Sequence, residues 1–202
     1  MNRNSSNRWF QSLMLALVFA LGGCAGSVKN MSLVPQDRIV SGPQQGKALV
    51  VFLRPSSMAF SIQSVVSEIV DNKPSLVGIV ASGKKVAYQV NPGKHLFMVT
   101  SESGDFLSAD LEKDKTYYAL VTPRMGAWKA RFSLKPIPAG ELNSSEFNDW
   151  LESCEWVEPN EDSLTWATNH MSKIQSLYDD NYARWMEKDP ASKPHLGPQD
   201  GR

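Results

Sequence analysis

The most constraining feature of this sequence is a series of short strand-like runs that are separated by turn residues, with no helical pattern between them. The last run alternates most clearly, since Trp128, Ala130, Phe132 and Leu134 would face one way and the residues between them the other. Such a period of two predicts a strand with one buried and one solvated face. The runs cover residues 47–54, 65–70, 75–80, 86–90, 95–100, 106–111, 116–121 and 128–135. About eight strands at this spacing predict a mainly β fold, specifically an antiparallel β-sandwich.

A different pattern follows the strands. Residues 144–151 predict a short helix, and a longer helix is predicted to begin after Asn160, whose side chain can cap it. Apolar residues then recur at steps of three or four up to about Lys188, as expected for one stripe on a helix. We therefore expect a C-terminal helical extension over residues 140–188 and an irregular tail over residues 189–202.

The N-terminus has the layout of a secretory signal peptide. A basic head precedes an apolar run of about 10 residues, which is too short to span a bilayer. Leu21, Gly22 and Gly23 close this run directly before Cys24, and this order matches the lipobox of bacterial lipoproteins. The match implies cleavage before Cys24 and acylation of Cys24, with palmitate among the acyl chains. The alternative is a plain signal peptide with a chance cysteine.

The lipobox divides the chain and suggests a location. It implies a signal peptide over residues 1–23, and residues 24–46, rich in Ser, Gly, Gln and Pro, then predict a flexible tether. The β-sandwich domain is expected over residues 47–137. Ala25 stands where an aspartate would retain a lipoprotein in the inner membrane, so the resemblance implies the outer membrane, facing the periplasm, in a Gram-negative cell.

Charge gives no reason to expect nucleic acid as a partner. The chain has 21 basic and 21 acidic residues, and removal of Arg3 and Arg8 with the signal peptide leaves 19 against 21.

The sequence contains no recognisable catalytic or metal-binding pattern. Its three histidines lack a His-x-x-x-His spacing, and no Cys-x-x-Cys or Gly-x-Ser-x-Gly motif occurs, so we predict neither an enzyme nor a cofactor or metal site. His95 is expected to be a partly buried, hydrogen-bonded residue, with a ligand or catalytic base as the alternative. With Cys24 acylated, Cys154 is either buried and inert or free to pair with another chain, and its apolar neighbours favour burial.

Three segments of the β region carry a family resemblance. They are Asn91–Phe97, Asp114–Tyr118 and Arg131–Pro136. Together they resemble an uncharacterised family of bacterial lipoprotein β-domains with P-G-x-H and G-K-x-Y-Y strand starts, similar to PEGA-type surface domains. Asp114 occupies the position at which that family usually has glycine. The resemblance covers roughly residues 47–137 and implies an immunoglobulin- or transthyretin-like sandwich on a lipid anchor, with no assigned catalytic residues.

A dense group of aromatic residues lies on the predicted long helix, and it includes Trp166, Tyr178, Tyr182 and Trp185. These rings either dock the helix on the sandwich or form an exposed interaction surface for a peptide, glycan or partner protein. We predict a non-enzymatic, lipid-anchored envelope lipoprotein that contacts the membrane through its anchor and acts as a protein-interaction module for another envelope protein. The alternative is a glycan- or small-ligand-binding lipoprotein that uses exposed aromatic side chains.

Overall fold

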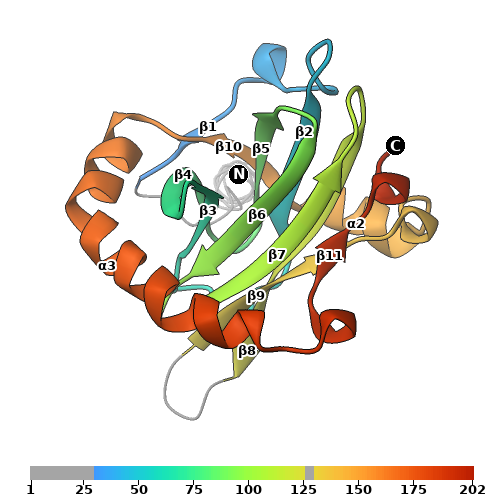
Figure 1. The fold of residues 1–202 in the computed structure, drawn as a ribbon. Helices are drawn as coiled ribbons and strands as arrows, with labels where there is room; N and C mark the ends of the chain where they lie inside the picture. Colours follow the sequence, from blue (N-terminus) through green and yellow to red (C-terminus); the bar gives the residue numbers. More distant parts are fainter. Residues whose placement is uncertain (1–29, 126–129) are drawn as a thin grey trace, which may run out of the picture.

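The computed structural model describes residues 30–125 and 130–202. The predicted signal-peptidase motif Leu21–Gly23, the predicted lipidation site Cys24 and Trp128 therefore lie outside the described residues. The described chain forms two β-sheets and a long C-terminal helix, which confirms the expected mainly β class (Figure 1).

The eight strands expected from the sequence correspond to β2 through β9, and three further short strands are present. The strands are β1 (Ser32–Leu33), β2 (Ala48–Arg54), β3 (Ser64–Val70), β4 (Lys73–Val80), β5 (Lys84–Val90), β6 (Gly93–Thr100), β7 (Gly104–Leu111), β8 (Thr116–Met125), β9 (Ala130–Pro136), β10 (Glu155–Glu158) and β11 (His195–Leu196). The helices are α2 (Ser145–Ser153) and α3 (Glu161–Met186), with single 3-10 turns η2 (Gln36–Arg38), η3 (Ala139–Glu141), η4 (Pro190–Ser192) and η5 (Pro198–Asp200).

The two sheets are mixed, so the expectation of a purely antiparallel fold was wrong. One sheet has the order β1-β10-β5-β2-β8-β9 and the other the order β11-β7-β6-β3-β4. Strands β2 and β8 run parallel at the centre of the first sheet, and the pairs β10–β5 and β11–β7 are also parallel. The alternation of side chains is the same in either strand direction, so periodicity alone could not distinguish the two.

The three additional strands lie in segments that were expected to contain none. Strand β1 falls in the expected tether, β10 in the helical extension and β11 in the tail, and all three pair with sheet strands. Met31, next to β1, is buried in the main core. The domain therefore includes residues from at least Met31 onward, which were expected to lie in the tether before residue 47. Segments of two to four residues are too short to show a period, so tertiary pairing alone defines these strands.

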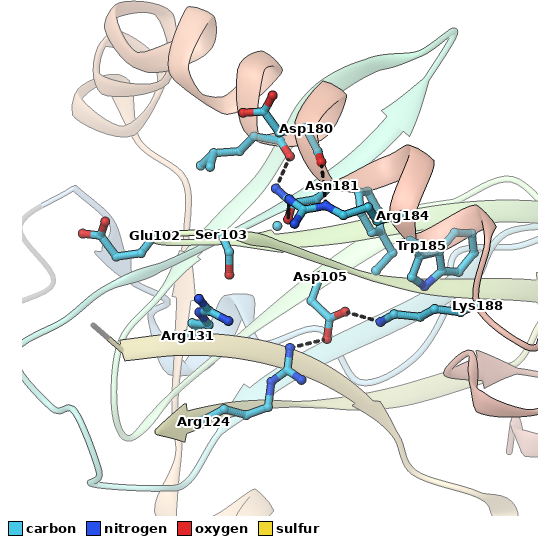
Figure 2. A pocket seen from close by; sticks show the side chains of 13 residues that line it. Glu102, Ser103, Asp105, Arg124, Arg131, Asp180, Asn181, Arg184, Trp185 and Lys188 are labelled. Atoms are coloured by element: carbon cyan, nitrogen blue, oxygen red, sulfur yellow. Dashed lines mark hydrogen bonds and ion pairs between the residues drawn. The ribbon is translucent and has the colours of Figure 1, made fainter. Parts of the chain in front are cut away.

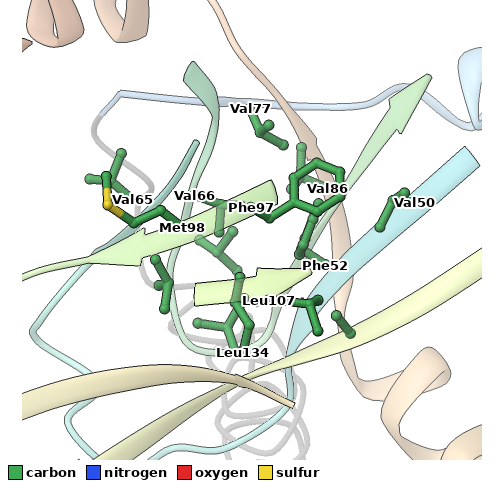
Figure 3. Close-up of a cluster of buried hydrophobic side chains, with 14 of the residues drawn as sticks. Val50, Phe52, Val65, Val66, Val77, Val86, Phe97, Met98, Leu107 and Leu134 are labelled. Atoms are coloured by element: carbon green, nitrogen blue, oxygen red, sulfur yellow. The ribbon is translucent and has the colours of Figure 1, made fainter. Parts of the chain in front are cut away.

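The main core lies between the two sheets. Strand β2 is buried along its whole length, with Val50 and Phe52 directed into this core (Figure 3). The rings of Phe52 and Phe97 meet across it at 5.1 Å between centroids. Phe132, expected to face inward on β9, is fully buried here. Leu49 and its alternate neighbours on β2 enter a second cluster on the other face of the sheet, which explains the continuous apolar run of this strand.

Each sheet also carries a helix on its outer face. Helix α2 covers the sheet that contains β2, where Phe147 packs on Tyr118 with ring centroids 4.9 Å apart. Helix α3 lies across the other sheet, in contact with β4, β6 and β7 (Figure 1). Its N-terminus is closed by the expected cap, since Ser163 N–H donates to Asn160 Oδ1 at 2.9 Å. Of the helices described, none is both long and apolar enough to cross a membrane.

Candidate functional site

The aromatic residues predicted on the long helix mostly face the β-sheet. Tyr178 and Trp185 are buried, and Trp166 and Tyr182 are half-buried. Three of these rings surround Phe106 of β7, with centroid distances of 6.1 Å for Tyr178, 5.7 Å for Tyr182 and 5.6 Å for Trp185. Docking was one of the two roles expected for this group. The candidate interaction surface at these four residues is therefore largely covered by the domain itself.

A fully buried arginine fixes the loop between β2 and β3. The guanidinium of Arg54 donates hydrogen bonds to the carbonyl oxygens of Ile62 at 2.6 Å, Ala59 at 2.7 Å and Met58 at 3.0 Å. It also lies 4.5 Å from the ring centroid of Phe132. Burial lowers the pKa of Arg54 to about 10, which still leaves the group charged at neutral pH. Three carbonyl acceptors on one cation hold residues 55–63, which we call the clamped loop, in a defined conformation.

The clamped loop displays two large apolar side chains. Phe60 is 75% exposed and Met58 is 51% exposed, although both sit beside residues that Arg54 holds in place. Ala59, between them, has a φ of 55°, a left-handed conformation that a non-glycine residue adopts only when its surroundings enforce it. An exposed aromatic residue on a rigid loop is a candidate contact point for a partner.

A second candidate lies where the C-terminal half of α3 passes the ends of β7, β8 and β9. This hollow, which we call the arginine cleft, has a volume of about 560 Å³ (Figure 2). Its apolar wall includes Phe106 and Trp185, and the ring nitrogen of Trp185 is buried without a hydrogen-bond acceptor in the described part of the chain. Its charged lining consists of Glu102, Asp105, Arg124, Arg131, Asp180, Arg184 and Lys188.

The cationic side chains of the arginine cleft are unequally compensated. Asp105 accepts from Arg124 at 3.1 Å and lies 3.7 Å from Lys188 Nζ, so one carboxylate serves two cations. Arg184 is held by neutral acceptors, the carbonyl of Asp180 at 3.1 Å and Asn181 Oδ1 at 3.3 Å.

Arg131 forms no ion pair with any carboxylate of the described residues, and its register partner across the β8–β9 ladder is another arginine, Arg124. Arg131 is therefore, like Arg184, a cation of the cleft without a carboxylate partner among the described residues.

A third polar group lies partly buried between the two sheets. Glu68, His95 and Tyr88 form what we call the inter-sheet triad: Glu68 accepts from His95 Nδ1 at 2.6 Å and from the Tyr88 hydroxyl at 2.6 Å. His95 Nε2 lies 2.8 Å from the carbonyl of Asn91. Because both ring nitrogens face acceptors, both must carry a proton, and His95 is an imidazolium. The structure thus places His95 as the partly buried, hydrogen-bonded residue that the sequence favoured.

The pKa shifts of the inter-sheet triad follow from these contacts. Burial alone would raise the pKa of Glu68, but the hydrogen bonds from His95 and Tyr88 outweigh it and lower that pKa. Burial alone would lower the pKa of His95, but the bonds to Glu68 and to the Asn91 carbonyl outweigh it and raise that pKa. The pKa of Tyr88 is raised by burial and by its bond to the Glu68 carboxylate.

Cys154 is buried, as its apolar neighbours predicted. Burial raises the pKa of its thiol, which disfavours the reactive thiolate. Lys85 is buried nearby, with its ammonium group bonded to the carbonyl of Leu151 and 4.7 Å from the ring centroid of Trp156.

Within residues 30–125 and 130–202, no group of three or more His, Cys, Asp or Glu side chains is arranged to hold a metal ion.

Sequence reasoning missed both the clamped loop and the arginine cleft. Arg54 was visible as a charged residue at the end of a continuous apolar run, and a charge in that place indicates a side chain that must find buried acceptors. The arginine cleft gave no comparable signal, because β7, β8, β9 and α3 meet there only in the fold. No protein-family model matches this chain, and no curated protein is significantly similar to it.

Proposed function

We propose that this chain is a non-enzymatic, lipid-anchored envelope lipoprotein whose β domain, of the immunoglobulin- or transthyretin-like sandwich type, binds another envelope protein. The lipobox that ends at Cys24 supports the anchor and a place at the outer membrane, facing the periplasm. The observation that carries the interaction role is Phe60, which is 75% exposed on a loop that Arg54 holds rigid.

An exposed aromatic side chain on a loop with a defined backbone conformation is well suited to protein recognition. Interfaces obtain most of their binding energy from a few anchors, often aromatic, that fill a pocket on the partner. Because the loop around Phe60 is already ordered by Arg54, little conformational entropy is lost when it binds. The clamped loop contains no lysine or arginine, the residues that typically accompany apolar side chains at a lipid surface. Its chemistry therefore favours an apolar pocket on a protein over a bilayer.

The described polar groups support a non-enzymatic role. His95 has both ring nitrogens engaged, so neither is available to accept a proton from a substrate. The thiol of Cys154 is buried and its pKa is raised.

Site-specific photocrosslinking in intact cells tests this proposal. A photoreactive residue in place of Phe60 should capture an envelope protein, whereas the same residue in place of Met186, which is 52% exposed at the end of α3, should not. Phe60→Ala should weaken binding of the captured protein by about tenfold or more, without lowering the melting temperature. Crosslinks from position 60 to lipid alone, or no difference between the two positions, would contradict the interaction role.

The anchor is tested separately. Labelled palmitate should mark the full chain, and Cys24→Ser should abolish the label. Label that persists in Cys24→Ser would reject acylation at this residue.

A further inference from the structure

We propose that the arginine cleft binds a small ligand through an oxyanion, either a carboxylate or a phosphate, held at Arg131. This site is separate from the clamped loop and does not depend on the lipid anchor. Arg131 and Arg124 stand opposite each other on β9 and β8, and within the described part of the chain only Arg124 has a carboxylate partner, Asp105.

The opposed arginines are a local conflict in the sheet. Like charges directly opposite on neighbouring strands repel each other, and because both arginines are exposed this repulsion is partly screened by solvent. A bound anion would relieve what remains of it. Asp105 cannot relieve both arginines, because it already serves Arg124 and Lys188. A local rule broken without internal compensation is most often found at a functional site.

The surroundings of Arg131 suit an oxyanion. Figure 2 shows the guanidinium of Arg131 and the hydroxyl of Ser103 directed into the same space, with Arg184 on the far side of the cleft. A guanidinium can bind two oxygens of a carboxylate or phosphate at once. The carboxylate of Glu102 is drawn turned away from the arginines, and Asp105 is occupied by its two cations. The place that remains for an added anion is therefore beside Arg131 and Ser103.

The size and wall of the arginine cleft indicate more than a bare ion. A volume of about 560 Å³ lies within the range typical of small-molecule sites, roughly 300–1,000 Å³. Phe106 and Trp185 contribute an apolar wall, and Asn181 and Ser103 contribute neutral hydrogen-bonding groups. This combination fits a compact polar ring, such as a sugar, that carries one acidic group.

Isothermal titration calorimetry of the full chain in detergent, at low salt, with three matched sugars tests the proposal. Glucuronic acid and glucose 6-phosphate carry a carboxylate and a phosphate on the ring of neutral glucose. At least one acidic sugar should bind, and its affinity should fall as salt is raised. Binding of only one would identify the carboxylate or the phosphate as the ligand group. No binding of either acid, or equal binding of glucose, would overturn the proposal.

Two variants on one strand then locate the site. Arg131→Gln should weaken binding of the acidic sugar by about tenfold or more, because a charge-assisted hydrogen bond is lost. Lys135→Gln removes the same charge from the same face of β9 at an exposed residue outside the cleft, and should leave the affinity unchanged. The melting temperature of Arg131→Gln should not fall, since the opposed arginines are relieved. An unchanged affinity for Arg131→Gln, or equal losses for both variants, would reject this assignment.

Discussion

The inter-sheet triad and the arginine cleft both place charged side chains against the same β domain, but they differ in how these charges are compensated. In the triad the Glu68 carboxylate accepts from both His95 and Tyr88, and the remaining nitrogen of His95 meets a backbone carbonyl. In the cleft Asp105 is shared between two cations and Arg131 has no ion-pair partner among the described residues.

The difference separates charges that stabilise the fold from charges available to a ligand. When a buried group makes all its hydrogen bonds, removal of any one partner lowers the free energy of unfolding of the protein. A charge that faces a like charge and lacks a counterion should cost the fold little when it is removed, and can even be destabilising while it is present. Substitutions in each cluster should therefore change stability by different amounts.

The largest effect is expected at the centre of the triad. Glu68→Ala leaves the His95 imidazolium and the Tyr88 hydroxyl without their shared acceptor, and should lower the free energy of unfolding by about 3 kcal/mol. Urea denaturation monitored by tryptophan fluorescence measures it. Glu152→Ala, at an exposed carboxylate of α2, is the control and should change stability by less than about 0.5 kcal/mol. Equal losses in the two variants would remove the distinction between the clusters.

Stability should also depend on pH through the same pair. The pKa of His95 is raised above 6.5, so its contribution is fully present below pH 6.5 and is lost as the pH rises through the folded-state pKa. The pKa of Glu68 is lowered below 4.5, so its contribution is present above pH 4.5 and is lost as the pH falls through the folded-state pKa. The contribution of the pair should therefore be greatest between these values. Urea midpoints across this range measure it, and His95→Gln should flatten the loss at higher pH.

A smaller effect is expected when one hydrogen bond is removed and the ring is kept. Tyr88→Phe retains the packing of the ring against Phe97, with centroids 6.3 Å apart, and removes only the bond to Glu68. It should destabilise the fold by about 1–2 kcal/mol. Thermal denaturation measures the change, and a loss as large as that of Glu68→Ala would show that the triad is not held by separate bonds.

The smallest effect, and the only one of opposite sign, is expected in the arginine cleft. Arg131→Gln relieves repulsion from Arg124 and should leave the free energy of unfolding unchanged or raise it by up to about 1 kcal/mol, most clearly at low salt. Parallel denaturation of Lys135→Gln gives the baseline for loss of one positive charge. Destabilisation by Arg131→Gln would mean that the cleft resembles the triad and serves the fold.

Sequence reasoning located the elements that local chemistry specifies. All eight expected strands are present, and Phe132 faces the core, as its place in the alternating run predicted. Asp114, which stands where the resembling family has glycine, takes the left-handed conformation that glycine favours, with a φ of 61°.

Contacts between distant segments could not be foreseen in the same way. Glu68 and His95 are 27 residues apart, and nothing in either strand pattern indicates that they face each other between the sheets. Arg124 and Arg131 lie on neighbouring strands, but the helix that completes their cleft begins near residue 160. Register, parallel pairing and the packing of α3 decide these sites, and each depends on the whole fold.

The burial of Met31 has a geometric consequence for a lipid-anchored chain. Met31 is held in the main core and β1 pairs with β10, so the residues directly after Asn30 already belong to the folded domain. Five residues lie between Cys24 and Asn30, and even a fully extended chain over the six steps from Cys24 to Asn30 spans only about 20 Å. The short segment after an acylated Cys24 would therefore keep the β1 edge of the domain close to the bilayer. A partner that binds at the β1 edge would therefore have to act close to the membrane surface.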